Sequence, residues 1–309
     1  AGSWWLSAAT PPVAGTQPEV VDALTVQWRA PKSKTARMVK LSVAEGTLRR
    51  EGGSLFGEFP IARPLLWSPA EPNLYDIVIS LPPPDGASHP GDRLRTSAAF
   101  RQVETAGHSL RLNGQALSVR GLLNWGYYPP GLAPVADEAR FRRDLELARE
   151  RGFNLMKFCL WVPPKRYLEL CDELGMLAWM EYPTWHPKFT PEHLEPLRQE
   201  FTEFFQYDRN HPSVILRSLT CETGPGADLE VIRSLYDTAK RMIPGAIVED
   251  DSSWIEWNRV SDIWDDHPYG NNHTWVPTLD RLNRYIAARE AKPLILGEAI
   301  AADTWPSLH

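Results

Sequence analysis

The order of its apolar patterns constrains the fold of this 309-residue chain more than any other feature. Up to residue 104, short alternating runs of apolar and polar residues are broken by Pro and Gly clusters, which is typical of an antiparallel β-sandwich. From residue 105 onward, short apolar runs alternate with amphipathic stretches of helical periodicity, a pattern that favours parallel strands joined by helices. The sequence therefore predicts two domains of different class.

The individual elements follow from these runs. In the first part, strands are predicted at 20–28, 38–43, 74–81 and 94–103. In the second part, helices are predicted at 137–151, 164–174, 194–207, 229–242 and 279–290. Strands are predicted between them, at 153–158, 176–181, 214–222, 246–249, 260–264 and 294–297. So many strand–helix units favour a (β/α)8-type TIM barrel.

Two glutamates each follow an apolar run. Val214–Cys221 precedes Glu222, and Pro293–Gly297 precedes Glu298. Such runs are typical of buried parallel strands, and barrel enzymes place their chemistry just beyond the carboxyl ends of these strands. Two carboxylates from different strands of one barrel can cleave a glycosidic bond. A single glutamate after a strand is more often structural, so the hypothesis depends on the pair.

Charge and composition argue against several classes of partner. The net charge is −6 and no block of like charge is present, which argues against nucleic acid or an anionic membrane as the main partner. No apolar stretch approaches the roughly 18 residues that a membrane span needs. These features leave the compartment open.

The possible metal ligands show no metal-binding spacing. The three cysteines have neither the number nor the spacing of a disulfide framework or a zinc site, so we expect free thiols at Cys159, Cys171 and Cys221. Four histidines lie in separate predicted loops: His186, His211, His267 and His273. We therefore expect no metal and no other cofactor.

Several motifs resemble glycoside hydrolase family 2 and occur in that family's order. Leu66–Tyr75 is similar to the motif that leads into a strand of its immunoglobulin-like domain. Phe100–Val103, Leu112–Gln115 and Val119–Gly121 resemble its crossing from sandwich to barrel. Three segments resemble its barrel signatures: Gly152–Asn154, Cys171–Gly175 and Asp208–Ser213. The resemblance implies a leader or linker at 1–16, an immunoglobulin-like β-sandwich at 17–104 and a TIM-barrel catalytic domain at 105–309.

The resemblance carries the family's catalytic roles onto the two glutamates. Glu222 matches the general acid/base, and Glu298 matches the nucleophile. Such enzymes retain anomeric configuration, because the nucleophile forms a covalent glycosyl-enzyme that water then hydrolyses with help from the acid/base. The two carboxyl groups should then lie roughly 5 to 5.5 Å apart. The implied activity is hydrolysis of a β-glycosidic bond in a carbohydrate.

Further residues are expected to bind the substrate. Tyr269 resembles a tyrosine that hydrogen-bonds the nucleophile, Glu181 matches an acidic residue after the third strand, and His267 is expected to line the cleft. Four tryptophans follow predicted strands and are candidates to wall a sugar subsite: Trp125, Trp161, Trp185 and Trp264. For each of these residues a purely structural role, in an ion pair or in the core, remains the alternative.

Departures from the family pattern leave a second function open. Cys221 stands where the family has an asparagine that hydrogen-bonds the sugar 2-hydroxyl, and Lys157 stands where it has an arginine. Both are still expected to contact the substrate. The alternative is a carbohydrate-binding remnant of the same fold, with weakened turnover or none.

The end of the chain leads to an expectation about partners. Eleven residues follow Glu298, too few for an eighth strand and helix. We therefore expect a barrel that is truncated before its eighth strand. Its gap, near Val119 and Leu294, is expected to be open or to be closed by the rest of a longer chain or by another copy.

Overall fold

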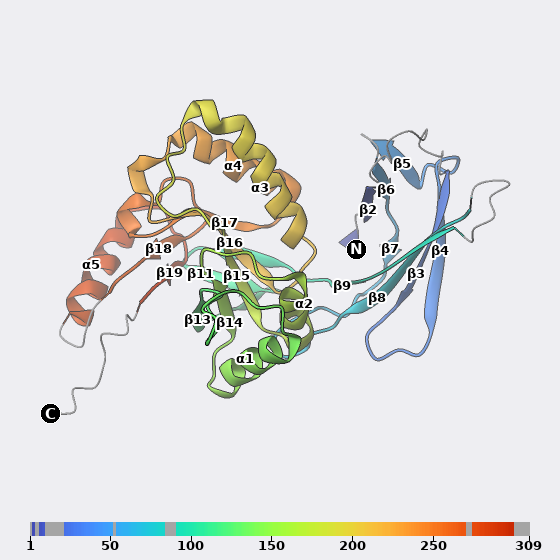
Figure 1. Ribbon diagram of the computed structural model, residues 1–309, viewed down its shortest axis with the longest axis horizontal. Helices are drawn as coiled ribbons and strands as arrows, with labels where there is room; N and C mark the ends of the chain where they lie inside the picture. The colour runs from blue at the N-terminus through green and yellow to red at the C-terminus, as the bar shows by residue number, and fades with distance from the viewer. Residues whose placement is uncertain are drawn as a thin grey trace. The chain divides into compact units, whose positions relative to one another are not determined.

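The computed structural model describes residues 2–3, 6–9, 22–51, 54–83, 91–269 and 274–299 (Figure 1). The chain divides into two compact units. The first comprises Ala1–Trp67 with Asn73–Phe100, and the second comprises Ser68–Pro72 with Arg101–His309. Within the described residues, no helix is both long enough and apolar enough to cross a membrane.

The first unit is built of antiparallel strands. Its largest sheet has the order β4-β3-β8-β9 and contains β3 (Ala23–Arg29), β4 (Ala36–Ser42), β8 (Tyr75–Leu81) and β9 (Asp92–Ala98). Alternate residues of β3 and β8 are buried, as expected for strands with one face on a core. The core residues of these strands include Leu24, Val26, Tyr75, Ile77 and Ile79. The four strands predicted from the sequence are confirmed, with shifted ends.

Shorter strands of the first unit were not predicted. A second sheet has the order β2-β6-β5, formed by β2 (Leu6–Ala9), β6 (Ser54–Gly57) and β5 (Leu48–Glu51). A further pair joins β1 (Gly2–Ser3) to β7 (Pro60–Ile61). Of the segment 1–16, expected to be a leader or linker, residues 2–3 and 6–9 are therefore strands, and the others lie outside the described residues.

The second unit begins with a small antiparallel sheet and continues into parallel strands. The small sheet contains β10 (Val103–Ala106), β11 (Ser109–Leu112) and β12 (Gln115–Ala116). Five parallel strands follow in sequence order: β13 (Gly121–Asn124), β14 (Leu155–Phe158), β15 (Leu177–Glu181), β16 (Val214–Cys221) and β17 (Ile247–Ser252). A separate parallel pair joins β18 (Trp264–Asp266) to β19 (Leu294–Leu296).

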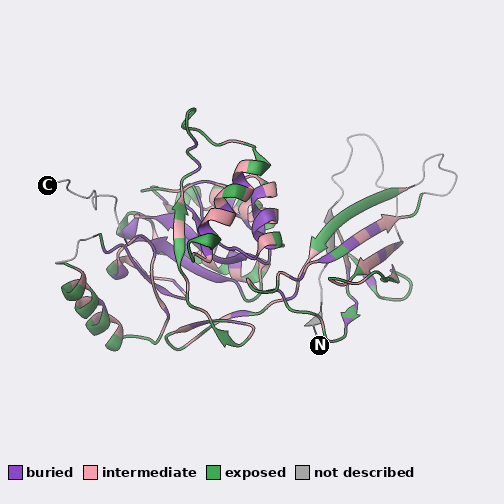
Figure 2. Ribbon diagram, turned by 90° about the horizontal axis from the view of Figure 1, so that it is seen from below, coloured by how far each residue is buried: buried purple, intermediate pink, exposed green. Residues whose placement is uncertain are grey.

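Helices connect these strands in the way the sequence predicts. They are α1 (Glu138–Glu150), α2 (Lys165–Leu174), α3 (Leu194–Asp208), α4 (Leu229–Met242) and α5 (Trp275–Ala287). Short 3₁₀ turns are η1 (Pro191–His193), η2 (Gly224–Gly226) and η3 (Ile255–Trp257). The Asp137 and Asp228 carboxylates cap α1 and α4 by accepting backbone N–H groups of the first turn. Every residue of β14 to β17 is buried, which explains their unbroken apolar runs (Figure 2).

Two element predictions were displaced. The strand predicted at 260–264 begins only at Trp264, because the Asp262 carboxylate accepts the Val248 N–H at 2.8 Å and holds the preceding segment as a loop. The helix predicted at 279–290 starts earlier, at Trp275. Pro277 lies in its first turn, where a missing N–H costs nothing.

A buried charge cluster fixes α3 to β16. Asp208, the last residue of α3, accepts two hydrogen bonds from the Arg217 guanidinium, at 2.8 and 2.6 Å. Its other oxygen accepts the Tyr182 hydroxyl at 2.7 Å. Nearby, Asp172 accepts the Ser213 N–H at 3.0 Å and pairs with His211 at 2.6 Å. The Asp208–Ser213 signature thus has a structural role in this chain.

Candidate active site

Glu222 and Glu298 meet at the carboxyl end of the parallel strands. Glu222 directly follows β16, and Glu298 lies two residues beyond β19. A carboxylate oxygen of each residue lies within 4.8 Å of the other. This proximity is compatible with the separation expected for a retaining pair. The side chain of Glu222 is 16% exposed and that of Glu298 is 9% exposed.

The backbone at Glu222 is strained. Its φ is 48°, in the left-handed region that a non-glycine residue enters at a cost of about 1–3 kcal/mol. The following turn is held by Asp251, whose carboxylate accepts the N–H groups of Thr223 at 3.0 Å and Gly224 at 2.8 Å. Gly224 also has a positive φ, of 54°, and an added Cβ would lie 2.6 Å from the Trp257 ring. The sequence thus fixes a tight turn directly after β16, at Glu222.

Three side chains contact the Glu222 carboxylate. His267 Nδ1 lies 3.2 Å from Oε1, and Tyr269 Oη lies 3.5 Å from the same oxygen. The Trp185 indole N–H donates to Oε2 at 3.2 Å. His267 is fully enclosed, with 1% of its surface exposed, whereas Trp185 is 60% exposed. The Glu222 carboxylate therefore has one buried neighbour, His267, and two exposed ones, since Tyr269 is 47% exposed.

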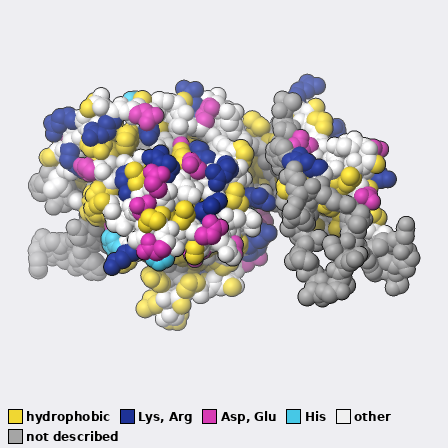
Figure 3. All heavy atoms as spheres, turned by 90° about the horizontal axis from the view of Figure 1, so that it is seen from above, with side chains coloured by type: hydrophobic (Ala, Val, Ile, Leu, Met, Phe, Trp, Pro, Cys, Tyr) yellow, Lys and Arg dark blue, Asp and Glu magenta, His cyan; other side chains and the backbone are white. Residues whose placement is uncertain are grey.

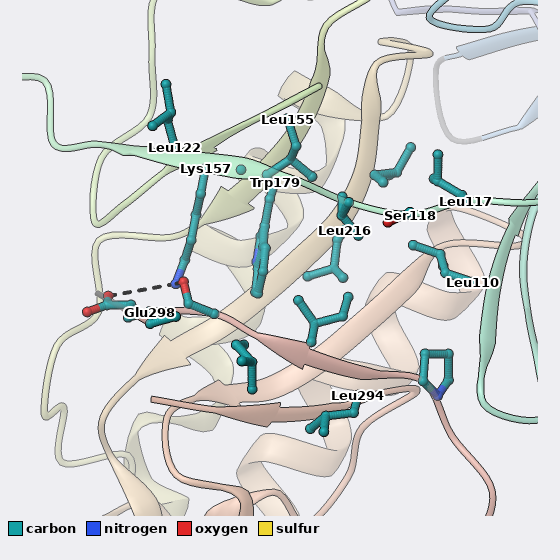
Figure 4. A pocket seen from close by; sticks show the side chains of 18 of the residues that line it. Leu110, Leu117, Ser118, Leu122, Leu155, Lys157, Trp179, Leu216, Leu294 and Glu298 are labelled. Atoms are coloured by element: carbon teal, nitrogen blue, oxygen red, sulfur yellow. Dashed lines mark hydrogen bonds and ion pairs between the residues drawn. The ribbon is translucent and has the colours of Figure 1, made fainter. Parts of the chain in front are cut away.

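Glu298 has a different set of partners. The Tyr269 hydroxyl donates a short hydrogen bond to Oε2. Lys157 Nζ lies 3.7 Å from Oε1 (Figure 4), and the Cys159 thiol lies 3.6 Å from the same oxygen. Burial and the hydrogen bond to Glu298 raise the pKa of Tyr269, so the phenol stays protonated as a donor.

Lys157 is a buried cation among carboxylates. Its ammonium lies 2.7 Å from Glu181 Oε2, donates to Ser252 Oγ at 2.8 Å, and lies 4.6 Å from the centre of the Trp179 ring. Burial alone would lower the pKa of Lys157, but Glu181, Asp265 and Glu298 outweigh it, and the pKa is well above its ordinary value. Lys157 therefore remains charged.

A cavity of about 1040 Å³ opens beside this site. Its apolar wall comes from β13, β14 and β19 and from the preceding small sheet, and Lys157 and Glu298 lie at one end of it (Figure 4). Tyr269 also lines the cavity. Val119 and Leu294, near which a gap is expected from the sequence, both line this cavity. Within the described part of the chain, no strand ladder joins β13 to β19.

Not every predicted substrate residue faces this cavity. Glu181 is 0% exposed and forms an ion pair with Lys157, which is the structural alternative considered for it. Cys221 is 2% exposed, and burial raises the pKa of its thiol. Trp161 and Trp264, predicted to wall a sugar subsite, are each 9% exposed, and their indole N–H groups donate to Asn124 O and Glu290 O. Trp125 lines the cavity and is 41% exposed.

Sequence reasoning missed three residues of the site. Ser252, at the end of β17, contacts Lys157, Asp265 and His267. Asp265 accepts the Gly297 N–H at 2.7 Å and thereby positions the segment before Glu298. Cys159 donates to Glu181 Oε1 at 2.9 Å. The available signal was that Cys159 and Asp265 directly follow predicted strands and that Ser252 lies three residues beyond one.

Two groups of side chains have the composition of a metal site. They are Glu222 with His267 and Glu298, and Cys159 with Glu181 and Glu298; within each group the atoms lie within 4.8 Å of one another. In both groups these atoms already bond to one another or to Lys157 and Tyr269. We assign no metal to either group.

Known proteins match both units. The descriptions "Glycosyl hydrolases family 2" and "Glycosyl hydrolases family 2, TIM barrel domain" match residues 16–101 and 103–308. A β-galactosidase of Vibrio cholerae is 31% identical over 249 residues, which are 77% of this chain and 24% of that protein. "Beta-galactosidase 2" of Enterobacter cloacae is 32% identical over 184 residues, which are 56% of this chain and 17% of that protein. The chain thus spans less than a quarter of the length of these curated relatives.

Solved structures show the same fold. The β-glucuronidase of Bifidobacterium dentium superimposes with a TM-score of 0.76 at 20% identity, over 90% of this chain and 47% of that one. The β-galacturonidase of Eisenbergiella tayi superimposes with a TM-score of 0.72 at 21% identity, over 89% of this chain and 50% of that one. At this level of identity the likeness concerns the fold. Together with the match over residues 103–308, it shows that the chain belongs to glycosyl hydrolases family 2 and carries its sandwich and TIM-barrel domains.

Proposed function

We propose that this chain carries the catalytic centre of a retaining glycoside hydrolase that cleaves β-glycosidic bonds. The observation that carries the proposal is the pair of carboxylates within 4.8 Å of each other in unlike surroundings. Glu298 Oε1 lies 3.7 Å from the buried ammonium of Lys157, which together with Tyr269 orients the carboxylate as a nucleophile. Glu222 is more exposed and contacts His267, which suits a residue that must gain and lose a proton.

The two steps follow from these positions. Glu298 attacks the anomeric carbon while Glu222 donates a proton to the departing oxygen, and a covalent glycosyl-enzyme forms. Glu222 then takes a proton from water, and the water oxygen displaces Glu298 from the anomeric carbon. Tyr269, which donates to Glu298 and lies near Glu222, keeps the nucleophile oriented between the steps.

The substrate class rests on the relatives and on the charge around the cavity. The named relatives are β-galactosidases, and the structural neighbours are β-glucuronidases and β-galacturonidases, so we infer a β-glycoside. Among the described residues that line the cavity, the cationic or titratable nitrogens are those of Lys157 and His108. Because Glu181 already pairs with Lys157, we favour a neutral sugar over a uronic acid.

A non-hydrolytic carbohydrate-binding role is the second candidate. The observation that favours it is Cys221, a buried thiol at the position where the family has an asparagine that hydrogen-bonds the 2-hydroxyl. Binding of a sugar without turnover by the unaltered protein would support this candidate.

We propose that further polypeptide of a longer chain covers the cavity in the working enzyme. β13 pairs with β14 and β19 pairs with β18, while Leu122, Leu155 and Leu294 line the space between β13 and β19. The match to less than a quarter of each curated relative supports this occupant over a second copy of the chain. Light scattering tests the choice: a dimer whose formation is blocked by Leu122→Lys would favour the second copy.

Replacement of the two glutamates tests the proposed chemistry. Glu298→Gln should abolish hydrolysis of aryl β-glycosides, because no other group can form the glycosyl-enzyme. Glu222→Ala should retain activity on substrates with activated leaving groups when azide is added, since azide can replace the base-activated water. Glu256→Gln, on the exposed side of η3, serves as the matched control. If both variants are folded, lose activity equally and are not rescued by azide, the assignment of nucleophile and acid/base would be contradicted.

A further inference from the structure

His267 connects Glu222 to a buried hydrogen-bonding network. Nδ1 faces Glu222 Oε1 at 3.2 Å, whereas Nε2 faces Ser252 Oγ at 3.1 Å and Asp265 Oδ2 at 3.5 Å. His267, Ser252 and Asp265 are each at most 1% exposed. These three side chains are therefore shielded from solvent, and the hydrogen atom in each of their contacts can be assigned to a donor.

The count fixes the proton on Nε2. Ser252 has one hydroxyl hydrogen, and its oxygen already accepts from Lys157, which can only donate. The hydroxyl donates to Asp265 Oδ2 at 3.0 Å, since a carboxylate oxygen that close must receive a hydrogen. The hydrogen is thus used, and Ser252 Oγ can only accept from His267. Nε2 must therefore carry a hydrogen.

The contact between Nδ1 and Glu222 then contains one proton. With Nε2 protonated, a neutral imidazole presents a lone pair at Nδ1, and Glu222 must donate to it. If the imidazole is charged, Nδ1 donates and Glu222 is the acceptor. The two arrangements differ only by movement of one proton across 3.2 Å.

We propose that Glu222 and His267 share one proton and serve together as the proton source and sink of the reaction, with Asp265 as the positioning residue that fixes the imidazole. This inference rests on the proposed glycosidase function. In the first step the pair gives its proton to the leaving oxygen as the bond to Glu298 forms. In the second step it regains one from the attacking water as that bond breaks.

The charges that face His267 support the pairing. Glu222, Asp265 and Glu298 are carboxylates, Lys157 is the facing cation, and Tyr269 is a neutral phenol. Burial alone would lower the pKa of His267, but Asp265 and Glu298 outweigh both burial and Lys157 and raise it above its ordinary value. A raised pKa means that the pair keeps its proton to higher pH than a free imidazole would. Because the groups interact, the measured value belongs to the pair.

Histidine-selective NMR of the intact chain tests the shared proton without any substrate. The ring nitrogens of His267, assigned by loss of their signals in His267→Gln, are followed through a pH titration. Glu222→Gln should lower the midpoint of His267 by about one pH unit, because it removes the facing carboxylate. Asp265→Asn should lower it by a similar amount. An unchanged midpoint in Glu222→Gln would overturn the proposal.

The same spectra contain a matched control. His211 forms a second buried pair, with Asp172 at 2.6 Å, and it belongs to a different network. Its signals should not respond to Glu222→Gln. If they move together with those of His267, the substitution has altered the whole unit, and Glu222→Asp, which keeps the carboxylate, must restore both. Failure to restore the midpoint of His267 would count against the shared proton.

Kinetics then separate this inference from the proposed function. His267→Gln should lower kcat/KM by about 10- to 100-fold for a poor leaving group, with little loss for an activated aryl glycoside. The alkaline limb of the pH profile should move to lower pH, because the variant lacks the imidazole whose raised pKa helps the pair keep its proton. If kcat/KM falls equally for both substrates and the alkaline limb of the pH profile does not move, His267 has only a structural role. Absence of turnover in the unaltered protein would contradict the proposed function, while the NMR titration would still decide the shared proton.

Discussion

The barrel unit contains two buried charge clusters that differ in balance. In the Arg217 cluster, which comprises Arg217, Asp208 and Tyr182, one cation meets one carboxylate, and both carboxylate oxygens accept hydrogen bonds. In the Lys157 cluster, one lysine faces four carboxylates: Glu181, Glu249, Asp265 and Glu298. All of these side chains are at least nine-tenths buried.

The difference indicates two kinds of role. The Arg217 cluster is balanced in charge and its carboxylate is fully hydrogen-bonded, so it connects α3 to β16 without any contribution from solvent or substrate. The Lys157 cluster has an excess of buried carboxylates, which costs free energy of folding unless protons or ligands compensate the charge. Such a cluster is therefore expected at a catalytic or binding site. On the face in view in Figure 3, by contrast, basic and acidic side chains are interspersed.

The largest expected effect is on stability, in the Arg217 cluster. Asp208→Asn leaves a buried guanidinium without its carboxylate, and arginine cannot lose its proton to escape the penalty. We expect the free energy of unfolding to fall by about 3–5 kcal/mol at every pH between 5 and 8. Urea denaturation followed by fluorescence measures this. Glu230→Gln, at an exposed pair with Arg233, is the control and should cost less than about 1 kcal/mol.

A smaller and opposite effect is expected at Glu249. Burial, followed by the charge of Asp265, raises its pKa well above the ordinary value, although Ser218 donates a hydrogen bond to it. The folded state therefore holds a proton that the unfolded state releases above about pH 4.3, and stability falls as pH rises from there. The substitution Glu249→Gln should remove this pH-dependent loss of stability.

The gain from Glu249→Gln should grow with pH. We expect at most about 1.4 kcal/mol per pH unit above pH 4.3, up to the folded-state pKa. Urea denaturation at pH 5, 6, 7 and 8 measures it. Glu256→Gln, whose side chain is 48% exposed, should show no such trend. A gain that shrinks with rising pH would mean that Glu249 is ionised in the folded state.

The sequence predicts the framework of this molecule better than its site. Buried runs such as Val214–Cys221 and the stripe of α1 have periods that identify strand and helix, and the cap at Asp137 marks where α1 begins. The short strands β5 and β6 carry few apolar residues and were missed. Their pairing depends on contacts that no local pattern records.

The site shows the same limit at the level of single residues. Glu222 and Glu298 could be selected because each ends a strand, and the structure brings them together. Trp161 also follows a strand, yet its ring packs against Gly126 in the core. Ser252 and Asp265 carry no motif, and their importance comes from contacts with Lys157 and Gly297, which lie 95 and 32 residues away in the sequence. Tertiary packing, not local pattern, decides such cases.

The smallest stability effect is expected at Glu181, and it separates the two clusters most sharply. Glu181 is as buried as Asp208 and also pairs with a cation, at 2.7 Å from Lys157. In Glu181→Gln, however, the lysine keeps Ser252 at 2.8 Å, Gly297 O at 3.4 Å and Glu298 at 3.7 Å. Removal of one carboxylate from an excess also relieves repulsion among the others. We therefore expect the free energy of unfolding to change by less than about 1 kcal/mol at pH 7.

Activity should respond where stability does not. Freed from Glu181, the Lys157 ammonium can move closer to Glu298 and hold the carboxylate more tightly, which weakens it as a nucleophile. Turnover of an activated aryl β-glycoside should therefore fall by about 10-fold or more, since nucleophile strength follows its proton affinity. Paired urea denaturation and steady-state kinetics of Glu181→Gln measure both effects. A loss of 3 kcal/mol or more would mean that Lys157 and Glu181 form a balanced structural pair, like Arg217 and Asp208, and the contrast between the clusters would fail.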